Sequence, residues 1–260
     1  MFFSFSSFLS SFLNKIFISQ FGAINPPWIY KEVFYKLPFN FCDCWYERCG
    51  LSGICRVYQK EKEQEKRFIK QGIDPKSIKA MFLSMTESFE ETKNLLKKGM
   101  KRLKIKITKE DDKKLEKEKN KKDKLIENDQ LTQISKKLAF QLVKLVEDLH
   151  YYFLEETPKE IKEPLKILNY YIFFFAVKIH RAILSNIEEK EMKYEDTTSD
   201  SKNSAFISYV SITKIINALK NISAYKNIDH SLYKKIIKYL SLFKNLNLVL
   251  EERFCLEIIS

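Results

Sequence analysis

Apolar residues recur at helical spacing in the C-terminal half of the chain. Between residues 131 and 153 they step by three and four positions without a gap, at Leu131, Ile134, Leu138, Leu142, Leu145, Leu149 and Phe153. Residues at this spacing share one face of an α-helix, so the stretch predicts an amphipathic helix. Similar patterns predict helices near 205–225 and 230–252, with Asp229 as the N-cap of the second.

The segment 167–177, ILNYYIFFFAV, is apolar on nearly every side. It predicts the buried helix of a bundle, and Pro158 and Pro164 are expected to bracket the turn that leads into it. Because Lys178, His180 and Arg181 interrupt the apolar run, it is expected to be too short to cross a membrane. The polar stretch 195–204 predicts a loop.

Upstream, residues 56–72 predict a charged helix that ends at Gly72 in a left-handed cap. Asp74 and Pro75 predict the N-cap and first position of the next helix, which runs to about residue 103. Its apolar face is formed by Ile78, Phe82, Met85, Phe89, Leu96 and Met100. Residues 104–130 alternate lysine with acidic residues, which predicts a solvated helix or a flexible linker and a domain boundary.

The first residues combine an aromatic stripe with serines. Phe5, Phe8, Phe12 and neighbouring apolar residues face one side, and Lys15 is the only charge among residues 1–30. This pattern predicts an amphipathic helix without the basic start of a secretory signal. We interpret it as a flap on the protein's own core, with peripheral membrane contact through residues 2–17 as the alternative.

Composition adds a fold class. The 260 residues include only five glycines and six prolines, which leaves little turn chemistry for a β protein. We therefore predict an all-α protein: an N-terminal cysteine-rich knuckle and long helices, followed by an up-and-down four-helix bundle. The predicted domains are an amphipathic and aromatic N-terminal segment (1–40), a cysteine knuckle with two helices (41–103), the charged linker or solvated helix (104–130) and the bundle (131–255).

Charge is concentrated in one part of the chain. The net charge is +12, and residues 56–127 carry 23 basic against 14 acidic side chains. A basic stripe attracts nucleic acid, so residues 93–124 are a candidate nucleic-acid surface. They contain no aromatic residue for base stacking, which counts against single-strand binding and favours a solvated, charged helix.

Four of the five cysteines lie close together, at Cys42, Cys44, Cys49 and Cys55. Disulfides suit secreted proteins, and the odd count and the missing signal argue against them. Four thiolates can close a tetrahedral zinc site or hold an iron–sulfur cluster. The spacing matches neither a standard zinc finger nor the ferredoxin pattern, so zinc, an iron–sulfur cluster and no metal remain open. Cys255 is expected to be a packed small hydrophobe.

The cysteine cluster is followed by RVYQ, a charged helix and an amphipathic helix, and later by IFFFAVKIHRAI and SDSKNSAFISYVSITKII. Together these segments resemble bacterial helical proteins of unknown function with an N-terminal four-cysteine cluster. The likeness covers about residues 41–250. It implies a helical fold and brings no activity.

Catalytic constellations are incomplete in this sequence. Glu147 and His150 form one Glu-x-x-His, but a di-iron bundle needs two such motifs and two more glutamates, and His180 and His230 have no matching glutamate. Lys178, His180 and Arg181 are expected to interact with a helix C-terminus rather than to bind phosphate. No phosphate loop or catalytic triad motif is present.

We therefore expect a non-enzymatic cytoplasmic protein that binds a protein partner and carries a metal knuckle. The alternatives are an iron–sulfur redox or enzymatic protein and a basic nucleic-acid-binding accessory protein.

Overall fold

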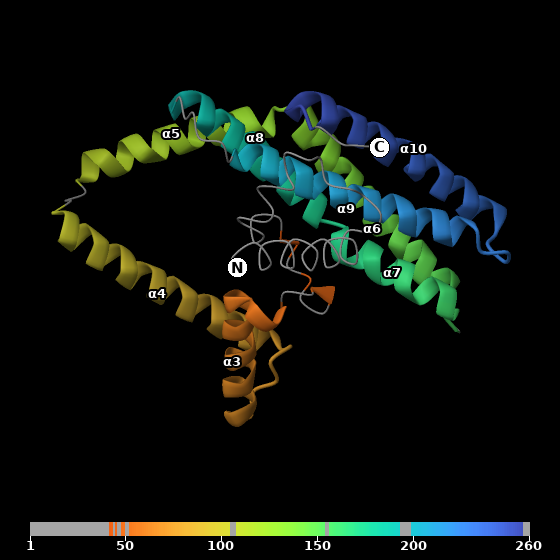
Figure 1. The fold of residues 1–260 in the computed structure, drawn as a ribbon, viewed down its shortest axis with the longest axis horizontal. Helices are drawn as coiled ribbons and strands as arrows, with labels where there is room; N and C mark the ends of the chain where they lie inside the picture. Colours follow the sequence, from red (N-terminus) through yellow and green to blue (C-terminus); the bar gives the residue numbers. More distant parts are fainter. Residues whose placement is uncertain are drawn as a thin grey trace, which may run out of the picture. The chain divides into compact units, whose positions relative to one another are not determined.

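A computed structural model describes residues 42, 43, 45, 48, 49, 52–104, 108–153, 156–192 and 199–256. These residues are almost entirely helical and include no β-strand, so the all-α prediction is confirmed for them (Figure 1). The elements are η3 (Ser52–Ile54), α3 (Arg56–Lys70), α4 (Ile78–Leu103), α5 (Lys109–Glu127), α6 (Gln130–Tyr152), α7 (Lys159–Tyr171), α8 (Phe174–Met192), α9 (Asp200–Ser223) and α10 (His230–Phe254).

The chain divides into two compact units, whose boundary lies inside α5. The smaller unit is Cys44–Lys119, and the larger unit comprises Met1–Asp43 and Asn120–Ser260. The N-terminal segment 1–40, including residues 2–17, lies outside the described residues. The domain limits drawn from the sequence stay a prediction.

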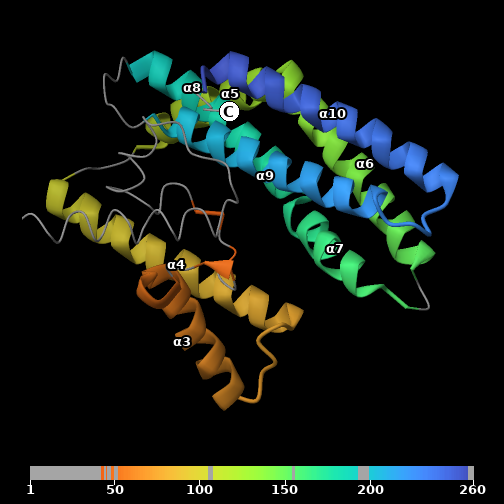
Figure 2. The same cartoon turned by 45° about the vertical axis from the view of Figure 1, so that its right-hand side comes forward.

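The central helix of the larger unit is α9. It packs against α7, α8 and α10, while α6 packs against α8 and α10 (Figure 2). Phe206, Ile215 and Leu219 are among its fully enclosed side chains. The expectation that 167–177 forms the most buried helix is therefore wrong: Phe173 and Val177 are exposed, and Phe174 is only half-buried.

Small polar residues allow α9 to occupy the core. Ser208 Oγ donates to the carbonyl oxygen of Phe175 at 3.0 Å, and Ser211 Oγ donates to that of Ile207 at 2.7 Å. Buried hydroxyls cost little when such partners satisfy them. The helix also takes in the end of the predicted loop 195–204, because it begins at Asp200 and its Ser201 is buried.

The helices α7 and α8 replace the single helix expected at 167–177. Pro164 lies inside α7 instead of in the preceding turn. The helix tolerates it because the proline removes one hydrogen bond, to the carbonyl oxygen of Glu160, which is an exposed residue near the helix start. The helix is interrupted at residues 172–173, so five helices, α6 to α10, follow α5 in the described part of the chain where four were expected.

The run of α7 and α8 is longer than the sequence suggested. Between Lys159 and Glu191 it contains a stretch that is apolar and long enough to cross a membrane by length and composition alone, a property that core helices of water-soluble proteins share. The charged residues at 178–181 do not end the helix, since α8 continues to Met192. The expected interaction of Lys178, His180 and Arg181 with a helix C-terminus is therefore wrong.

Helix ends follow the predicted chemistry at two positions and depart from it at a third. Asp229 caps α10 by accepting from the Leu232 amide at 2.9 Å, and Gly72 adopts a left-handed φ of 70° after α3, both as predicted. Asp74 does not cap α4. It accepts from the Lys76 amide in a turn, and Ser77 is the N-cap instead.

The charged segment 104–130 was predicted to be either a solvated helix or a flexible linker. It is helical over Lys109–Glu127. Its last turns belong to the larger unit. Ile126 is completely buried, and Lys122 forms ion pairs with Glu191 at 2.9 Å and Glu188 at 3.8 Å on α8.

The start of α6 is tied to the end of α10 by Asp129. Its carboxylate accepts from the Leu131 amide at 2.9 Å and from the Thr132 amide at 3.3 Å. Arg253 adds two further hydrogen bonds, at 2.9 and 2.5 Å. Burial raises the pKa of this carboxyl, but the Arg253 guanidinium and the two amides lower it more, so the net pKa lies below the ordinary aspartate value.

We expect Asp129→Asn to keep the N-cap, because asparagine caps equally well, and to lose the charge. Since the folded pKa is depressed, the carboxylate stabilises the fold above the unfolded pKa of about 3.9 and this contribution is lost as the pH falls through the folded pKa. The variant should be less stable at pH 7 by about 1 kcal/mol, a value discounted for partial solvent screening.

Urea denaturation at several pH values measures this difference, which should shrink below about pH 4. Asp123→Asn, at an exposed carboxylate on α5, is the control and should change stability by no more than about 0.5 kcal/mol. A difference that stays constant down to pH 3 would contradict the assignment.

In the smaller unit, polar contacts join α3 to α4. Lys60 pairs with Glu91 at 2.5 Å and Arg67 with Glu87 at 2.5 Å, and Ser84 Oγ donates to Gln64 at 2.9 Å. Phe68 of α3 and Ala80 of α4 are the buried residues of these two helices.

Candidate functional site

The predicted cysteine site is only partly within the described residues. Cys44 lies outside them; Cys42 belongs to the larger unit, and Cys49 and Cys55 belong to the smaller one. The Ser52 amide donates to the Cys49 carbonyl at 3.1 Å, and the Cys55 amide donates to the Ser52 carbonyl at 3.2 Å. No group of three or more His, Cys, Asp or Glu side chains in the described ranges is placed to hold a metal. The four-cysteine site stays a prediction.

The remaining candidate residues are dispersed. His150 is exposed and its Nε2 lies 3.2 Å from Asn169 Nδ2, while Glu147 is exposed. Cys255 is exposed too, so the expectation of a packed thiol is wrong. It follows α10 with a left-handed φ of 48°, which turns its side chain out of the helical pattern. Residues 93–124 fall on the end of α4 and on α5, with 105–107 outside the described part.

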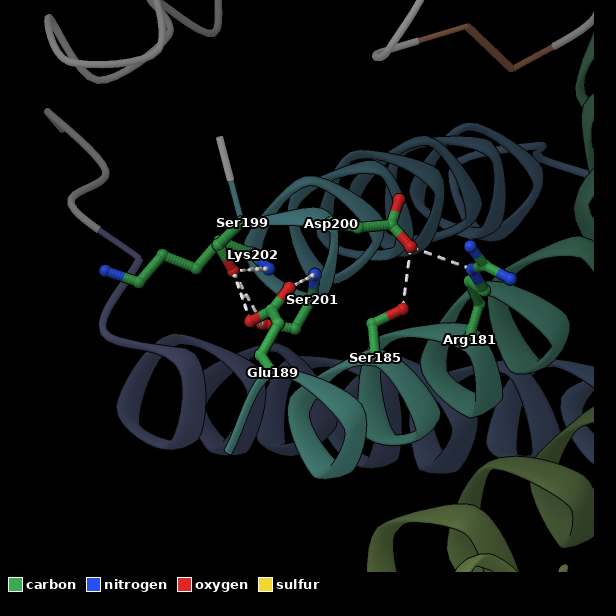
Figure 3. A network of polar contacts seen from close by, with 7 residues as sticks. All are labelled: Arg181, Ser185, Glu189, Ser199, Asp200, Ser201 and Lys202. Atoms are coloured by element: carbon green, nitrogen blue, oxygen red, sulfur yellow. Dashed lines mark hydrogen bonds and ion pairs between the residues drawn. The ribbon is translucent and has the colours of Figure 1, made fainter. Parts of the chain in front are cut away.

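A polar network joins α8 to the N-terminus of α9 (Figure 3). Glu189 accepts from the Ser201 amide at 3.0 Å, from Ser201 Oγ at 2.8 Å and from Ser199 Oγ at 2.9 Å. Asp200 accepts from Arg181 at 2.8 Å and from Ser185 at 2.6 Å. The N-terminus of a helix attracts anions, and here the protein's own carboxylate takes that place. The network therefore locks α9 onto α8 and offers no free anion site.

A second polar cluster lies around Asp43. Its carboxylate accepts from Lys214 Nζ at 3.1 Å and from the Tyr171 hydroxyl, and Lys214 also donates to Tyr171 Oη at 2.7 Å. Tyr170 Oη donates to the Asp43 backbone carbonyl at 2.8 Å. Asp43 is nearly buried and Tyr171 fully so, which leaves no access for a substrate. The cluster holds the chain beside Cys42 against α7 and α9.

A groove in the larger unit lies between α6 and α10. Its volume is about 430 Å³. The floor and walls are mostly apolar, and Lys137 of α6 and Lys238 of α10 stand at its edges. The lining residues are Leu131, Ile134, Lys137, Leu138, Gln141, Lys238, Leu242, Asn245, Leu246 and Val249.

The two rims of this groove keep apolar side chains in contact with water. Ile134 is 39% exposed and Val249 is 44% exposed, although both belong to otherwise buried helix faces. Among the described residues, neither Lys137 nor Lys238 forms an ion pair. The groove thus offers an apolar floor and two available cations.

Comparison with protein-family models, curated proteins and solved structures finds no match to this chain in any of the three. The resemblance of residues 41–250 to bacterial helical proteins therefore stays a prediction.

The sequence pattern predicted neither the groove nor the Asp43 cluster. The sequence signal for the groove was Ile134, which belongs to the predicted apolar face of α6 but is 39% exposed in the structure. The Asp43 cluster joins residues 128 and 171 positions apart, so no local pattern could have revealed it.

Proposed function

We propose that this chain is a non-enzymatic binding protein whose groove between α6 and α10 receives an amphipathic helix of a protein partner. The observation that carries the proposal is an apolar groove with two available lysines at its edges. An apolar helix face laid into a groove between two helices is a recurring mode of peptide recognition.

The groove has the dimensions of such a ligand. On α6 the lining runs from Leu131 to Gln141, and on α10 it runs from Lys238 to Val249. Each side therefore presents about three helical turns, roughly 15 Å of length. A helix of similar length would pack its apolar stripe on Leu138 and Leu246 as a further member of the bundle.

The charges of the rim select the partner. Lys137 and Lys238 stand on opposite sides of the groove, so acidic residues on both flanks of the incoming helix would meet a cation. Charge complementarity of this kind speeds association and discriminates against basic helices. We expect a ligand with a leucine-rich face and flanking glutamates.

The experiment uses a fluorescent synthetic helix of about 15 residues, with leucines at helical spacing and glutamates on both flanks, and a scrambled peptide of the same composition. Fluorescence anisotropy with the full chain should detect binding of the first peptide and not of the second. Ile134→Glu and the pair Lys137→Glu with Lys238→Glu should each weaken binding at least about tenfold.

Leu248→Glu is the matched control. Leu248 is the neighbour of Val249 on α10 and is exposed, but it does not line the groove. Binding unchanged in the groove variants, or equal for both peptides, would refute the proposal.

A metal knuckle at Cys42, Cys44, Cys49 and Cys55 remains part of the proposed cytoplasmic protein. The backbone hydrogen bonds from Ser52 to Cys49 and from Cys55 to Ser52 keep the backbones of these two cysteines near each other, which supports this proposal. Anaerobic purification followed by metal analysis and an absorption spectrum separates zinc from an iron–sulfur cluster. A metal-free, colourless protein would contradict the metal knuckle. The proposed role of the groove does not depend on that result.

A further inference from the structure

The apolar stripe of α4 is uncovered. The predicted face of this helix contains Phe82 and Phe89, which are 60% and 69% exposed, and Leu96, which is 62% exposed. Ile78, Met85 and Leu103 are exposed as well. Such a continuous stripe of large side chains marks an interaction surface.

The contacts with α3 lie on another side of α4. They involve Ser84, Glu87 and Glu91, which pair with Gln64, Arg67 and Lys60. Residues 84, 87 and 91 share one helical face, and residues 82, 85 and 89 share a different one. The hairpin therefore leaves the apolar stripe pointing away from α3.

The stripe follows a heptad repeat. Positions 78, 82, 85, 89, 92, 96, 99 and 103 alternate steps of four and three residues along the whole of α4. This spacing is the a/d pattern of a coiled coil. Two of these positions hold small residues, Thr92 and Gly99, and both belong to the C-terminal half.

We propose that α4 pairs with α4 of a second copy of this chain in an antiparallel coiled coil. In an antiparallel pair, each a position lies beside a d position of the partner. With the two helices fully overlapped, Phe82 of one copy lies beside Gly99 of the other, and Phe89 lies beside Thr92. Each large ring thus meets a small residue.

The other two layers also fit this arrangement. Met85 lies beside Leu96 of the other copy, and Ile78 lies beside Leu103. The two phenylalanine pairs thus join a large and a small residue, and the other two pairs join aliphatic side chains of ordinary size for a coiled-coil core. In a parallel pair, by contrast, Phe82 would face Phe82 and Gly99 would face Gly99, leaving crowded layers and a void.

The basic residues of α4 also disfavour a parallel pair. After Glu91 the helix carries five basic residues, Lys93, Lys97, Lys98, Lys101 and Arg102, and no acidic one. A parallel pair would place the two basic ends side by side, whereas an antiparallel pair places them at opposite ends of the seam.

Sedimentation velocity of the full chain across micromolar concentrations tests the pairing. We expect a monomer–dimer equilibrium whose dissociation constant rises at least about tenfold in Phe89→Asp. Leu83→Asp changes an apolar residue of the same helix outside the a/d positions and should leave the equilibrium unchanged.

The direction of the pair is tested at Gly99. A side chain at Gly99 meets nothing within 4 Å in the single chain, and replacing a helical glycine raises helix propensity. In the antiparallel pair, Gly99→Leu collides with Phe82 and weakens the dimer, while Phe82→Ala combined with Gly99→Leu restores it. In a parallel pair, Gly99→Leu would fill a void and tighten the dimer.

The outcomes are distinct. Tightening by Gly99→Leu overturns the antiparallel arrangement. A full-length monomer at all concentrations overturns self-association, and a monomer that dimerises after deletion of residues 1–20 assigns the stripe to the N-terminal segment instead. Because these variants lie outside the α6–α10 groove, the peptide assay remains an independent measurement.

Discussion

Phe175→Ala is expected to lower the free energy of unfolding by about 3–5 kcal/mol, the largest effect that we predict for a single truncation. Phe175 is fully buried, and its ring packs edge-on against Phe243 of α10 with centroids 5.4 Å apart. Its backbone carbonyl accepts from Ser208 of α9. The truncation therefore opens a cavity where α8, α9 and α10 meet, and the rigid surroundings can fill little of it.

Phe173→Ala is the matched control for this prediction. Phe173 lies two residues away and is 47% exposed, with one ring contact to Phe140 at 5.8 Å. Its removal should cost about 1 kcal/mol or less. Calorimetry and urea denaturation measure both variants. Equal losses would mean that the buried face of α8 is wrongly assigned.

Lys214→Met should be the second most damaging substitution, at about 3 kcal/mol. The side chains of Lys214 and Asp43 are only 19% and 9% exposed, so removing the ammonium leaves a carboxylate with little access to water. A buried carboxylate that loses an ammonium partner is destabilised, and the hydrogen bond from the neutral Tyr171 hydroxyl does not replace that charge.

Asp43→Asn combined with Lys214→Met completes a double-mutant cycle. The double variant should be more stable than Lys214→Met, because the buried negative charge is gone. Urea denaturation gives the coupling, and limited proteolysis near residue 43 shows whether this part of the chain detaches from α7 and α9. Additive effects of the two substitutions would show that the pair contributes no coupling energy.

The fold was predictable where the residues of a single helix determine its ends and its apolar face. The face of α6 from Leu131 to Phe153 is buried as expected, except at Ile134. Asp229 begins a helix and Gly72 ends one, and both effects depend on a few neighbouring residues. In α4 the local pattern was equally clear, yet it said only which side is apolar and not what covers that side.

The candidate sites were not predictable in the same way. The α6–α10 groove arises because two amphipathic helices leave a gap along their shared edge, which depends on their packing and not on either pattern alone. The four cysteines pointed to a metal by proximity in sequence, but thiols near one another along the chain need a fold to bring their sulfur atoms into one shell.

By itself, the sequence determined that this protein is helical. Apolar residues at helical spacing specify a helix within one or two turns, and the scarcity of glycine and proline leaves few residues for the tight turns of a β protein. Only the tertiary structure decided which helix is central. Hydrophobicity singled out 167–177, but α9 occupies the core, since its serines find carbonyl partners within the bundle and its small side chains let α7, α8 and α10 approach closely. Burial is a property of the whole assembly of helices, and a polar residue can be enclosed wherever a partner for its hydrogen bond lies within reach.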